Sequence, residues 1–364
     1  MKEIEKIIER YEATDWTTER TALATVVVVE ESAYRRIGAR MYVSSTGQWI
    51  GGISGGCLEG DALKKAKLAI LNNRPSVVIY DTMEDDAHQI GVGLGCNGRI
   101  EVLFTPVDPK DDNNPIELLK KIKDRRTETI LLQVIETKQS EQLGLCCTSN
   151  NRAELERRLN LDPTFLNAGI ANVRDRKKST ILLTPSGERL LIEWLRPNLR
   201  LMLIGDNYDV NAFVDMAVVL GWEVHLAGKK QKISRTIFDK ATQVYTYETI
   251  KQLPIDPYTA VILMSHDYRT DLELLQFYAP LSVSYIGLLG PRKRMEKMQA
   301  ELLAQNSIID LDTVSTLFAP VGLDIGAESP EEIALSIAAE IIGVFRERDG
   351  GSLRERDGPI HERE

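Results

Sequence analysis

The chain has 364 residues, of which 43% are hydrophobic and 27% charged, and its formal net charge is −9 at pH 7. The length favours two domains over one, and the composition is that of a soluble globular protein. The negative charge argues against a nucleic-acid partner, and apolar runs such as 24–29 have the length of strands and are too short to cross a membrane.

Residues 1–16 have helical periodicity and many charges, unlike the apolar core of a secretory leader. The chain has four cysteines, which form neither a CxxC pair nor a disulfide-rich framework. We therefore expect a cytoplasmic protein whose thiols are free.

Two strands are predicted next, over 21–30 and 40–44, because β-branched or alternating residues dominate these segments. The polar loop between them carries Arg35, Arg36 and Arg40. A single surface arginine is usually solvated, but three arginines close to a glycine-rich loop favour contact with a phosphate.

That glycine-rich loop reads GGISGGCLEG at 51–60, and a predicted helix over 58–72 follows it. Glycine lets the backbone approach a ligand closely. The N–H groups at a helix start are unpaired within the helix, and they bind anions and favour a thiolate. The sequence therefore predicts an anion cradle with the thiol of Cys57 at its edge.

A second glycine-rich thiol loop reads GVGLGCNGR at 91–99. Its Cys96, like Cys57, is flanked by glycines, which make an apolar core setting difficult to build. Cys146 and Cys147 instead lie in a predicted strand and are interpreted as packing residues. A thiolate is a soft ligand suited to molybdenum, copper or zinc, and it can also accept or transfer sulfur. Two thiols alone do not make a closed zinc site, so we favour a pair that handles a ligand.

The rest of the first domain is a predicted mixture of helices and strands. Pro197 and Asn198 precede a strongly apolar strand, and we place the domain boundary there. The predicted organisation is a mixed α+β domain over 1–196, a Rossmann-like domain over 197–347 and a charged tail over 348–364. The elements predicted between the second thiol loop and the boundary are a strand at 100–104, a helix at 118–123, strands at 129–135 and 142–148, a helix-prone stretch at 151–160 and two strands ending near Trp194.

From residue 200 strands and helices alternate, which predicts a doubly wound parallel sheet. Its first turn lacks the G-x-G-x-x-G of a dinucleotide fold, because the sequence from Gly205 reads GDNYDV. Asn207 replaces the second glycine, and Asp206 would repel phosphate. Gly228 stands where the second strand should end in an acidic residue. These differences argue against conventional dinucleotide binding.

Two other signals lie in the second domain. His266 and Asp267 follow a predicted strand at the carboxyl edge of the sheet, where such sheets bind ligands. A helix-capping or hydrogen-bonding role is an equal alternative for His266. Arg292, Lys293 and Arg294 begin a predicted helix, where cations oppose the helix dipole, so we predict an anion site there.

Taken together, these residues make the chain resemble the XdhC/CoxI family of accessory factors for molybdenum hydroxylases such as xanthine dehydrogenase. SAYRRIGARM, GGISGGCLEGD and GLGCNGRIEV resemble the N-terminal domain of the family. SHDYRTDLELL, YIGLLGPRKR and GLDIGAESPEEIALSIAAEI resemble its C-terminal Rossmann-type domain. The resemblance covers nearly the whole chain, and SGGC and GLGC are its specific parts.

The resemblance implies a cytoplasmic, homodimeric chaperone, not an enzyme, that binds the molybdenum cofactor. It also implies partners: a cysteine desulfurase that sulfurates the cofactor and a hydroxylase of the xanthine dehydrogenase type that receives it. Family cysteines implicated in cofactor binding correspond by motif to Cys57 and Cys96, which become possible molybdenum ligands. The other residues assigned to cofactor binding are Gly52, Ser54, Gly55, Gly56, Arg36, Arg40, Arg99, His266, Asp267, Arg292 and Arg294.

Three alternatives remain open at the level of sequence. The second domain could serve a nicotinamide-dependent oxidoreductase, against which the missing glycine fingerprint counts. The basic triplet at 292–294 together with Asp267 could serve a nucleotidyltransferase acting on the pterin phosphate. The glycine-rich loops could also serve only dimer packing in an interaction protein.

Overall fold

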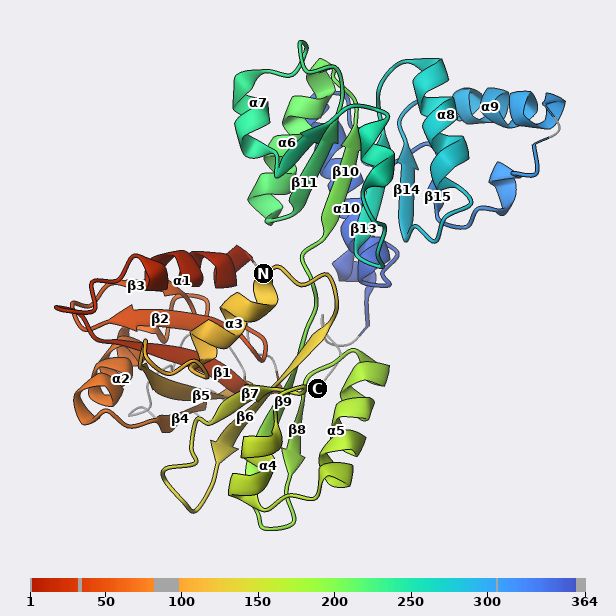
Figure 1. The fold of residues 1–364 in the computed structure, drawn as a ribbon. Coiled ribbons are helices and arrows are strands. Elements are labelled where there is room, and N and C mark those ends of the chain that lie inside the picture. Colours follow the sequence, from red (N-terminus) through yellow and green to blue (C-terminus); the bar gives the residue numbers. More distant parts are fainter. Residues whose placement is uncertain (1, 32–34, 82–97, 306, 358–364) are drawn as a thin grey trace. The chain divides into compact units, whose positions relative to one another are not determined.

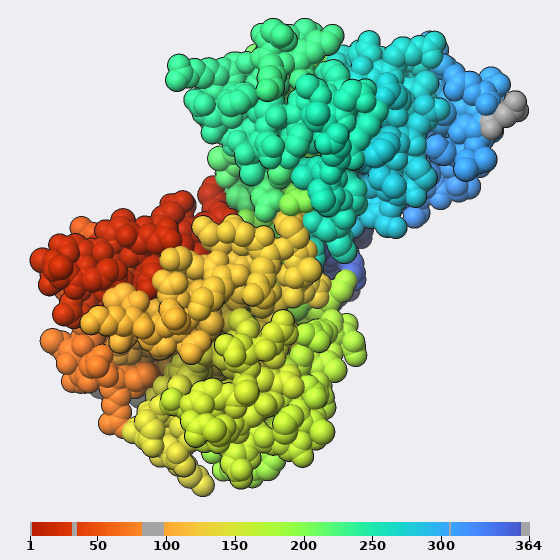
Figure 2. All heavy atoms as spheres, in the orientation of Figure 1, coloured from red at the N-terminus to blue at the C-terminus, as the bar shows by residue number. Residues whose placement is uncertain are grey.

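A computed structural model of the chain describes residues 2–31, 35–81, 98–305 and 307–357. These residues form two compact units, one within the first 197 residues and one spanning Asn198–Arg356 (Figure 1). The first unit contains two antiparallel sheets and the second a parallel sheet, which confirms the predicted fold class. Each unit has a core of buried hydrophobic side chains, and Figure 2 shows one outer face of the residues with all their heavy atoms. No helix in the described part of the chain is long and apolar enough to span a bilayer.

A five-stranded antiparallel sheet carries the glycine-rich loop of the first unit. Its strands, in spatial order, are β3 (Trp49–Gly51), β2 (Arg40–Ser44), β1 (Thr21–Glu31), β5 (Gly98–Val107) and β4 (Ser76–Asp81), and the helices beside it are α1 (Lys2–Glu12), α2 (Glu59–Asn72) and α3 (Pro115–Lys123). Side chains of β1 alternate between the two faces, with Ala22 and Ala24 packed toward α2 and Leu23 toward α1 and α3. Small residues on both surfaces let α2 lie close to the sheet.

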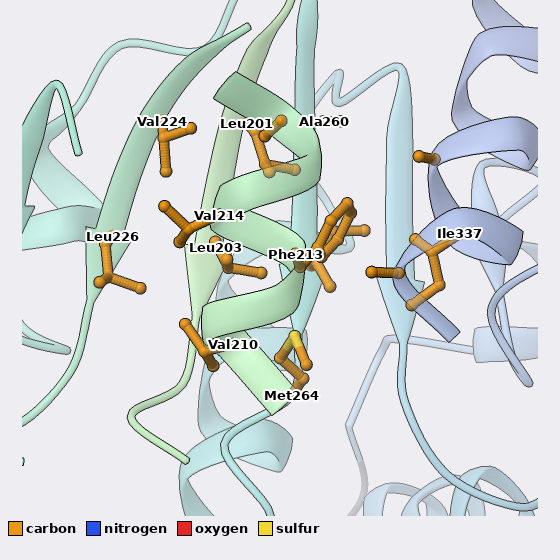
Figure 3. Close-up of a cluster of buried hydrophobic side chains, with 14 of the residues drawn as sticks. Leu201, Leu203, Val210, Phe213, Val214, Val224, Leu226, Ala260, Met264 and Ile337 are labelled. Atoms are coloured by element: carbon orange, nitrogen blue, oxygen red, sulfur yellow. The ribbon is translucent and has the colours of Figure 1, made fainter. Parts of the chain in front are cut away.

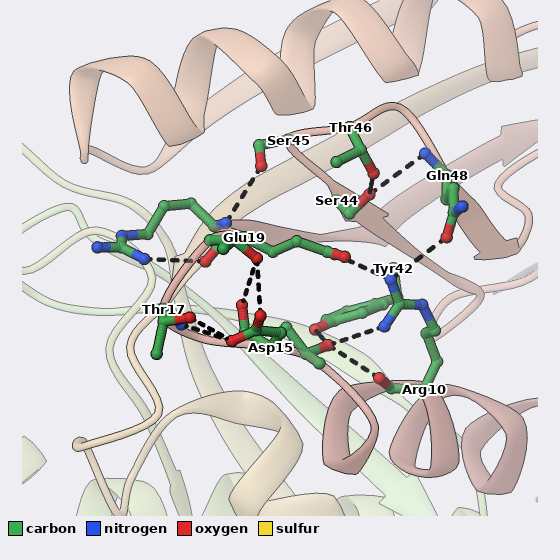
Figure 4. Close-up of polar contacts among 12 residues, drawn as sticks. Arg10, Asp15, Thr17, Glu19, Tyr42, Ser44, Ser45, Thr46 and Gln48 are labelled. Atoms are coloured by element: carbon green, nitrogen blue, oxygen red, sulfur yellow. Dashed lines mark hydrogen bonds and ion pairs between the residues drawn. The ribbon is translucent and has the colours of Figure 1, made fainter.

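Polar contacts tie the segment after α1 to β2 and to the turn between β2 and β3 (Figure 4). Arg10 Nη2 donates to Glu19 Oε2 at 2.9 Å and to Gln48 Oε1 at 3.3 Å. The hydroxyl oxygens of Thr14 and Tyr42 are 2.9 Å apart in a buried position. These contacts fix β3, which leads directly into the glycine-rich loop.

The second sheet of this unit has four antiparallel strands. In spatial order they are β7 (Cys146–Thr148), β6 (Thr129–Glu136), β9 (Arg189–Leu195) and β8 (Thr180–Leu183), accompanied by α4 (Ala153–Leu159) and α5 (Pro163–Arg176). The sequence pattern did not predict α5. Its start is nevertheless well capped, because the Asp162 side chain accepts from the Thr164 N–H at 2.8 Å and Pro163 opens the helix. Gly169 lets α5 approach β9, since a Cβ there would lie 2.9 Å from Ile192 Cδ1.

The second unit is built on a six-stranded parallel sheet. In spatial order the strands are β12 (Gln243–Tyr245), β11 (Glu223–Ala227), β10 (Arg200–Ile204), β13 (Thr259–Leu263), β14 (Tyr285–Leu288) and β15 (Leu317–Phe318), and the helices are α6 (Tyr208–Leu220), α7 (Arg235–Lys240), α8 (Tyr268–Tyr278), α9 (Arg292–Ala304) and α10 (Pro330–Phe345). Side chains of α6 and α10 pack on one face, where Phe213 meets Leu203 and Ile337 (Figure 3). Side chains of α8 and α9 pack on the other face. Burial of both faces explains the continuous apolar runs of β10 and β13.

Candidate functional site

The glycine-rich loop begins against the backbone of β2. Gly51 has φ +82°, and a Cβ at this position would lie 2.2 Å from the carbonyl oxygen of Arg40. The next N–H, of Gly52, donates to the same oxygen at 2.9 Å. Glycine is therefore required here by a close approach within the protein itself, and not only by an incoming ligand.

Ser54 accepts hydrogen bonds from the backbone at the start of α2. Its Oγ accepts from the N–H groups of Gly56 at 3.2 Å, Cys57 at 3.1 Å and Leu58 at 3.0 Å. These N–H groups have no acceptor within the helix, as expected, but an internal hydroxyl outside the helix satisfies them. Gly55 and Gly56 are exposed at the tip of the loop, and a Cβ added to Gly56, which has φ +110°, would have no atom within 4 Å.

Glu59, in the first turn of α2, closes the other side of the loop. Its Oε1 accepts from the N–H groups of Ile53 at 3.2 Å and Ser54 at 2.8 Å, and its Oε2 accepts from Ser54 Oγ at 2.5 Å. Burial would raise the pKa of this carboxyl, but the hydrogen bonds from Ser54, Ile53 and its own N–H together lower it. Donors of the loop therefore hold an anion that is a side chain of the protein, and binding of a ligand anion there stays a prediction.

Cys57 lies between these two groups at the edge of the loop. It is half-buried and packs beside the apolar cluster of α2, β1 and β2. Cys146 and Cys147 pack in two different clusters, on opposite sides of their strand. Burial raises the pKa of the Cys147 thiol to about 12 and raises that of Cys146 as well. Cys96 lies outside the described residues, so the predicted pairing of its thiol with Cys57 stays a prediction.

Arg40 is turned into the protein and away from solvent. Its side chain is 4% exposed and forms a bidentate ion pair with Glu193 of β9, with Nη2 at 2.5 Å from Oε2 and Nη1 at 3.0 Å from Oε1. Nη1 also donates to the carbonyl oxygen of Gly38 at 2.6 Å. The guanidinium joins the two sheets of the first unit and is not presented at the glycine-rich loop.

Arg99 and Arg36 differ in their partners. Arg99 forms ion pairs with Glu30 at 2.8 Å and with the buried Glu101 at 3.0 Å. Arg36 is half-buried, and within the described ranges its side chain has no hydrogen-bond or ion-pair partner. Of the three arginines assigned as charge partners, Arg36 is thus the one whose charge is not balanced by a described carboxylate.

The first turn of the parallel sheet is occupied by its own side chains. Asp206 is 3% exposed and accepts from the Lys229 N–H at 2.9 Å, the Tyr247 hydroxyl at 3.0 Å and Lys232 Nζ at 3.3 Å. A Cβ at Gly228 would lie 2.8 Å from Asp206 Cβ, so the carboxylate needs the glycine opposite it. The acidic residue expected at the end of β11 is thus replaced by a carboxylate from the turn after β10.

Hydrogen bonds also cross the opening between β10 and β13, which is the topological switch point of this sheet. Asn207 Nδ2 donates to the Ser265 carbonyl oxygen at 2.6 Å. His266 has φ +58°, and its Nε2 lies 2.9 Å from Asp209 Oδ2. Asp267 caps α8 by accepting from the Thr270 N–H at 2.8 Å. His266 and Asp267 therefore lie at the predicted edge with partners from the protein itself.

The predicted anion site at α9 contains one internally paired arginine and two exposed basic residues. Arg294 Nη2 forms an ion pair with Asp271 Oδ2 at 2.6 Å, and Asp271 is fully buried. Arg292 and Lys293 are exposed, and no described residue pairs with their side chains. The helix has no side-chain cap at Pro291, which leaves its N-terminal end open to an anion.

The sequence does not reveal the roles of two residues of the first unit, Glu59 and Glu193. Glu59 follows Ser54 by five positions and not by the three of a capping box, so the usual spacing does not reveal the pair. Glu193 lies 153 residues from Arg40, and no local pattern connects them. No cluster of three or more histidine, cysteine or acidic side chains suited to a metal occurs within the described ranges.

Comparison with known families and structures matches both units. The model of the XdhC and CoxI family matches residues 17–81, which include the glycine-rich loop, and the model of the XdhC Rossmann domain matches residues 201–341. A protein of Bacillus subtilis (strain 168) named as a probable subunit of xanthine dehydrogenase is 29% identical over 333 residues, covering 89% of this chain and 93% of that protein.

Two further relatives cover most of the chain. The molybdenum cofactor insertion chaperone PaoD of Escherichia coli (strain K12) is 24% identical over 322 residues, covering 88% of this chain and 82% of that protein. A crystal structure described as a xanthine dehydrogenase from Bacillus halodurans is similar with a TM-score of 0.71 and 25% identity, covering 95% of this chain and 98% of that one.

Proposed function

The chain belongs to the XdhC and CoxI family, and from this premise we propose that it is a chaperone that binds the molybdenum cofactor. It supports sulfuration of the cofactor by a cysteine desulfurase and delivers it to a hydroxylase of the xanthine dehydrogenase type. The names of the relatives from Bacillus subtilis and Escherichia coli support the client and the cargo, respectively. In this proposal the protein carries the cofactor, acts in the cytoplasm as a homodimer and catalyses no reaction of its own.

The observation that carries the proposal is the position of Cys57. Its thiol lies at the edge of a glycine-rich loop that holds an anion, inside the segment matched by the family model. The cargo has a phosphate, which suits backbone N–H donors, and a soft metal–sulfur centre, which suits a thiolate. Exposed Gly55 and Gly56 leave the tip of the loop open to a ligand. Cys96 is the second thiol of the proposal.

The partners of the other assigned residues support a narrower set of cofactor contacts in this proposal. Arg36 is the charge partner for the phosphate, since Arg40 and Arg99 already pair with carboxylates. Of the two assigned arginines of the second unit, Arg292 is available to an anionic group, whereas Arg294 pairs with Asp271. We assign no nucleotide to this unit, because Asp206 and Asn207 fill its first turn.

The test is retention of molybdopterin by protein purified from a molybdenum-replete host. The wild type should release a pterin that is detectable as its fluorescent oxidation product, and Cys57→Ala and Cys96→Ala should each lose most of it. Cys146→Ala is the matched control, because it removes a thiol that packs against the core beside α1 and α3. Full retention by both loop variants would show that the thiols do not hold the cofactor, and absence of pterin from the wild type would overturn the proposal.

A further inference from the structure

The carboxylate of Glu59 is held in the glycine-rich loop without a cationic partner. It accepts two backbone N–H groups and one hydroxyl, from Ile53 and Ser54. Among the residues that the structure describes, no lysine or arginine forms an ion pair with it. Its charge is therefore balanced by the donors of the loop, which are the groups that an anionic ligand would use.

We propose that Glu59 is a specificity-determining residue: it is the resident anion of the loop, and a ligand anion binds by taking over its donors. Gly52 lies close to this carboxylate, because a Cβ there would be 3.1 Å from Glu59 Oε1. The side chain belongs to the first turn of α2 and is half-buried, so rotation about its own bonds carries the carboxylate away without unfolding the helix. Released Ser54 then offers its N–H and hydroxyl to the ligand.

The exchange favours a particular class of ligand. A monoanion such as nitrate replaces one negative charge by another and gains little from the same donors. A phosphomonoester dianion brings twice the charge to the same N–H groups and forms stronger charge-assisted hydrogen bonds. Glu59 thus selects a phosphomonoester dianion over singly charged anions.

The inference rests on the proposed function in one respect, since it treats the loop as the phosphate subsite of the cofactor. Two other described carboxylates near predicted anion-binding groups differ from Glu59. Glu193 and Asp271 are buried and paired with arginines, so their removal would leave an unpaired charge in the core. A ligand that replaces Glu59 leaves no such buried cation.

The experiment measures binding of inorganic phosphate and of nitrate to the full chain by isothermal titration calorimetry at about pH 8, where phosphate is mainly dianionic. The variants are Glu59→Gln and the control Glu331→Gln. Glu331 makes a matched control because it is exposed in the first turn of α10, so the same charge change occurs in the other unit. A thermal unfolding transition confirms that each variant is folded.

Glu59→Gln should bind phosphate at least about tenfold more tightly than the wild type, because the competing charge is gone, and should unfold at a lower temperature. The combination of tighter phosphate binding with lower thermal stability is diagnostic. Loss of a purely structural contact would lower both the phosphate affinity and the unfolding temperature. The preference for phosphate over nitrate should remain in Glu331→Gln. An unchanged or weaker phosphate affinity in folded Glu59→Gln overturns the proposal.

A variant that does not fold is replaced by a second measurement on the wild type. Titration of ¹⁵N-labelled protein with phosphate should shift the amide resonances of Ile53 and Ser54, whose bonds to Glu59 are exchanged. Saturation with phosphate that leaves both resonances in place overturns the proposal. Failure of the proposed function has a different result, namely wild-type protein without pterin, and it leaves the phosphate measurements intact.

Discussion

Both units have a turn that leads from a strand into a helix, and in both a carboxylate accepts the backbone N–H groups of the region. In the first unit Glu59 comes from the helix after the turn, is half-buried and has no cationic partner in the described structure. In the second unit Asp206 lies within the turn itself and its side chain is 3% exposed. Its carboxylate accepts hydrogen bonds from the Lys229 N–H and the Tyr247 hydroxyl and forms an ion pair with Lys232. In our proposal the first arrangement opens for a ligand, whereas Asp206 occupies the turn where a dinucleotide fold would place its phosphate.

A glycine in such a turn does not by itself mark a ligand site. Gly51 is needed because the Arg40 carbonyl lies against it, and Gly228 because Asp206 does. Gly55 and Gly56, in contrast, are exposed at the tip of the first turn. The two turns differ in how accessible their backbone N–H groups are and in which groups already accept hydrogen bonds from them.

The largest effect on stability should follow from breaking the buried ion pair between Glu193 and Arg40, the residue whose carbonyl oxygen contacts the start of the first turn. Glu193→Ala leaves the Arg40 guanidinium buried and unpaired, so we expect the free energy of unfolding of the first unit to fall by about 3–5 kcal/mol. Denaturant unfolding measures this change. The double variant Arg40→Met/Glu193→Leu removes both charges and should recover most of the loss. A loss below about 1 kcal/mol in the single variant would mean that water reaches the pair.

A smaller effect is expected at the second turn. Asp206→Ala leaves the Lys229 N–H and the Tyr247 hydroxyl without their acceptor, which should lower the stability of the second unit by about 1–3 kcal/mol. Asp215→Ala is the control, because its ion pair with Lys240 is exposed and contributes at most about 1 kcal/mol. Equal effects of the two variants, measured by denaturant unfolding, would show that Asp206 stabilises its turn no more than an exposed ion pair does.

Ser54→Ala tests the hydroxyl that caps α2. Three N–H groups lose their acceptor, and by analogy with helix caps we expect about 1 kcal/mol of destabilisation confined to the first unit. Ser234→Ala makes the equivalent change in the second unit, where Ser234 accepts from the Ile237 N–H at 3.3 Å. Thermal unfolding of the two variants should therefore affect different transitions, and a shared transition would contradict the prediction.

The smallest effect concerns pH. Burial would raise the pKa of Asp206, but the Lys229 N–H, the Tyr247 hydroxyl and Lys232 together lower it below its usual value. A carboxyl whose pKa is lowered on folding contributes stability above its unfolded pKa of about 4, and the contribution is lost as the pH falls through the folded value. The second unit of the wild type should therefore lose stability more steeply below about pH 4 than that of Asp206→Asn. Parallel pH profiles would contradict this assignment.

Local patterns were sufficient to predict much of the fold. The helical stripe of α2 and the buried strands β10 and β13 follow from periodicity and apolar runs. Helix α5 was missed because it is only weakly amphipathic, and its polar face obscures the apolar stripe. The close approach of Gly169 to Ile192 appears only once the sheet has formed.

The site was predictable only in part, because the sequence reveals local signals and does not reveal contacts between distant residues. Glycine and cysteine in one short segment located the loop and Cys57, because both signals are local. The partners of the predicted donors were not predictable, since Arg40 and Glu193 meet only through the packing of two sheets. The arginine pattern at 35–40 could not distinguish the inward Arg40 from Arg36, because both occupy the same polar stretch.

Arg40 also links two distant parts of the first unit. Its carbonyl oxygen accepts from Gly52 at 2.9 Å while its guanidinium holds Glu193 of β9, so a single residue connects the thiol loop to the four-stranded sheet. A substitution that breaks the ion pair on β9 therefore acts on the same residue whose carbonyl oxygen anchors the start of the loop.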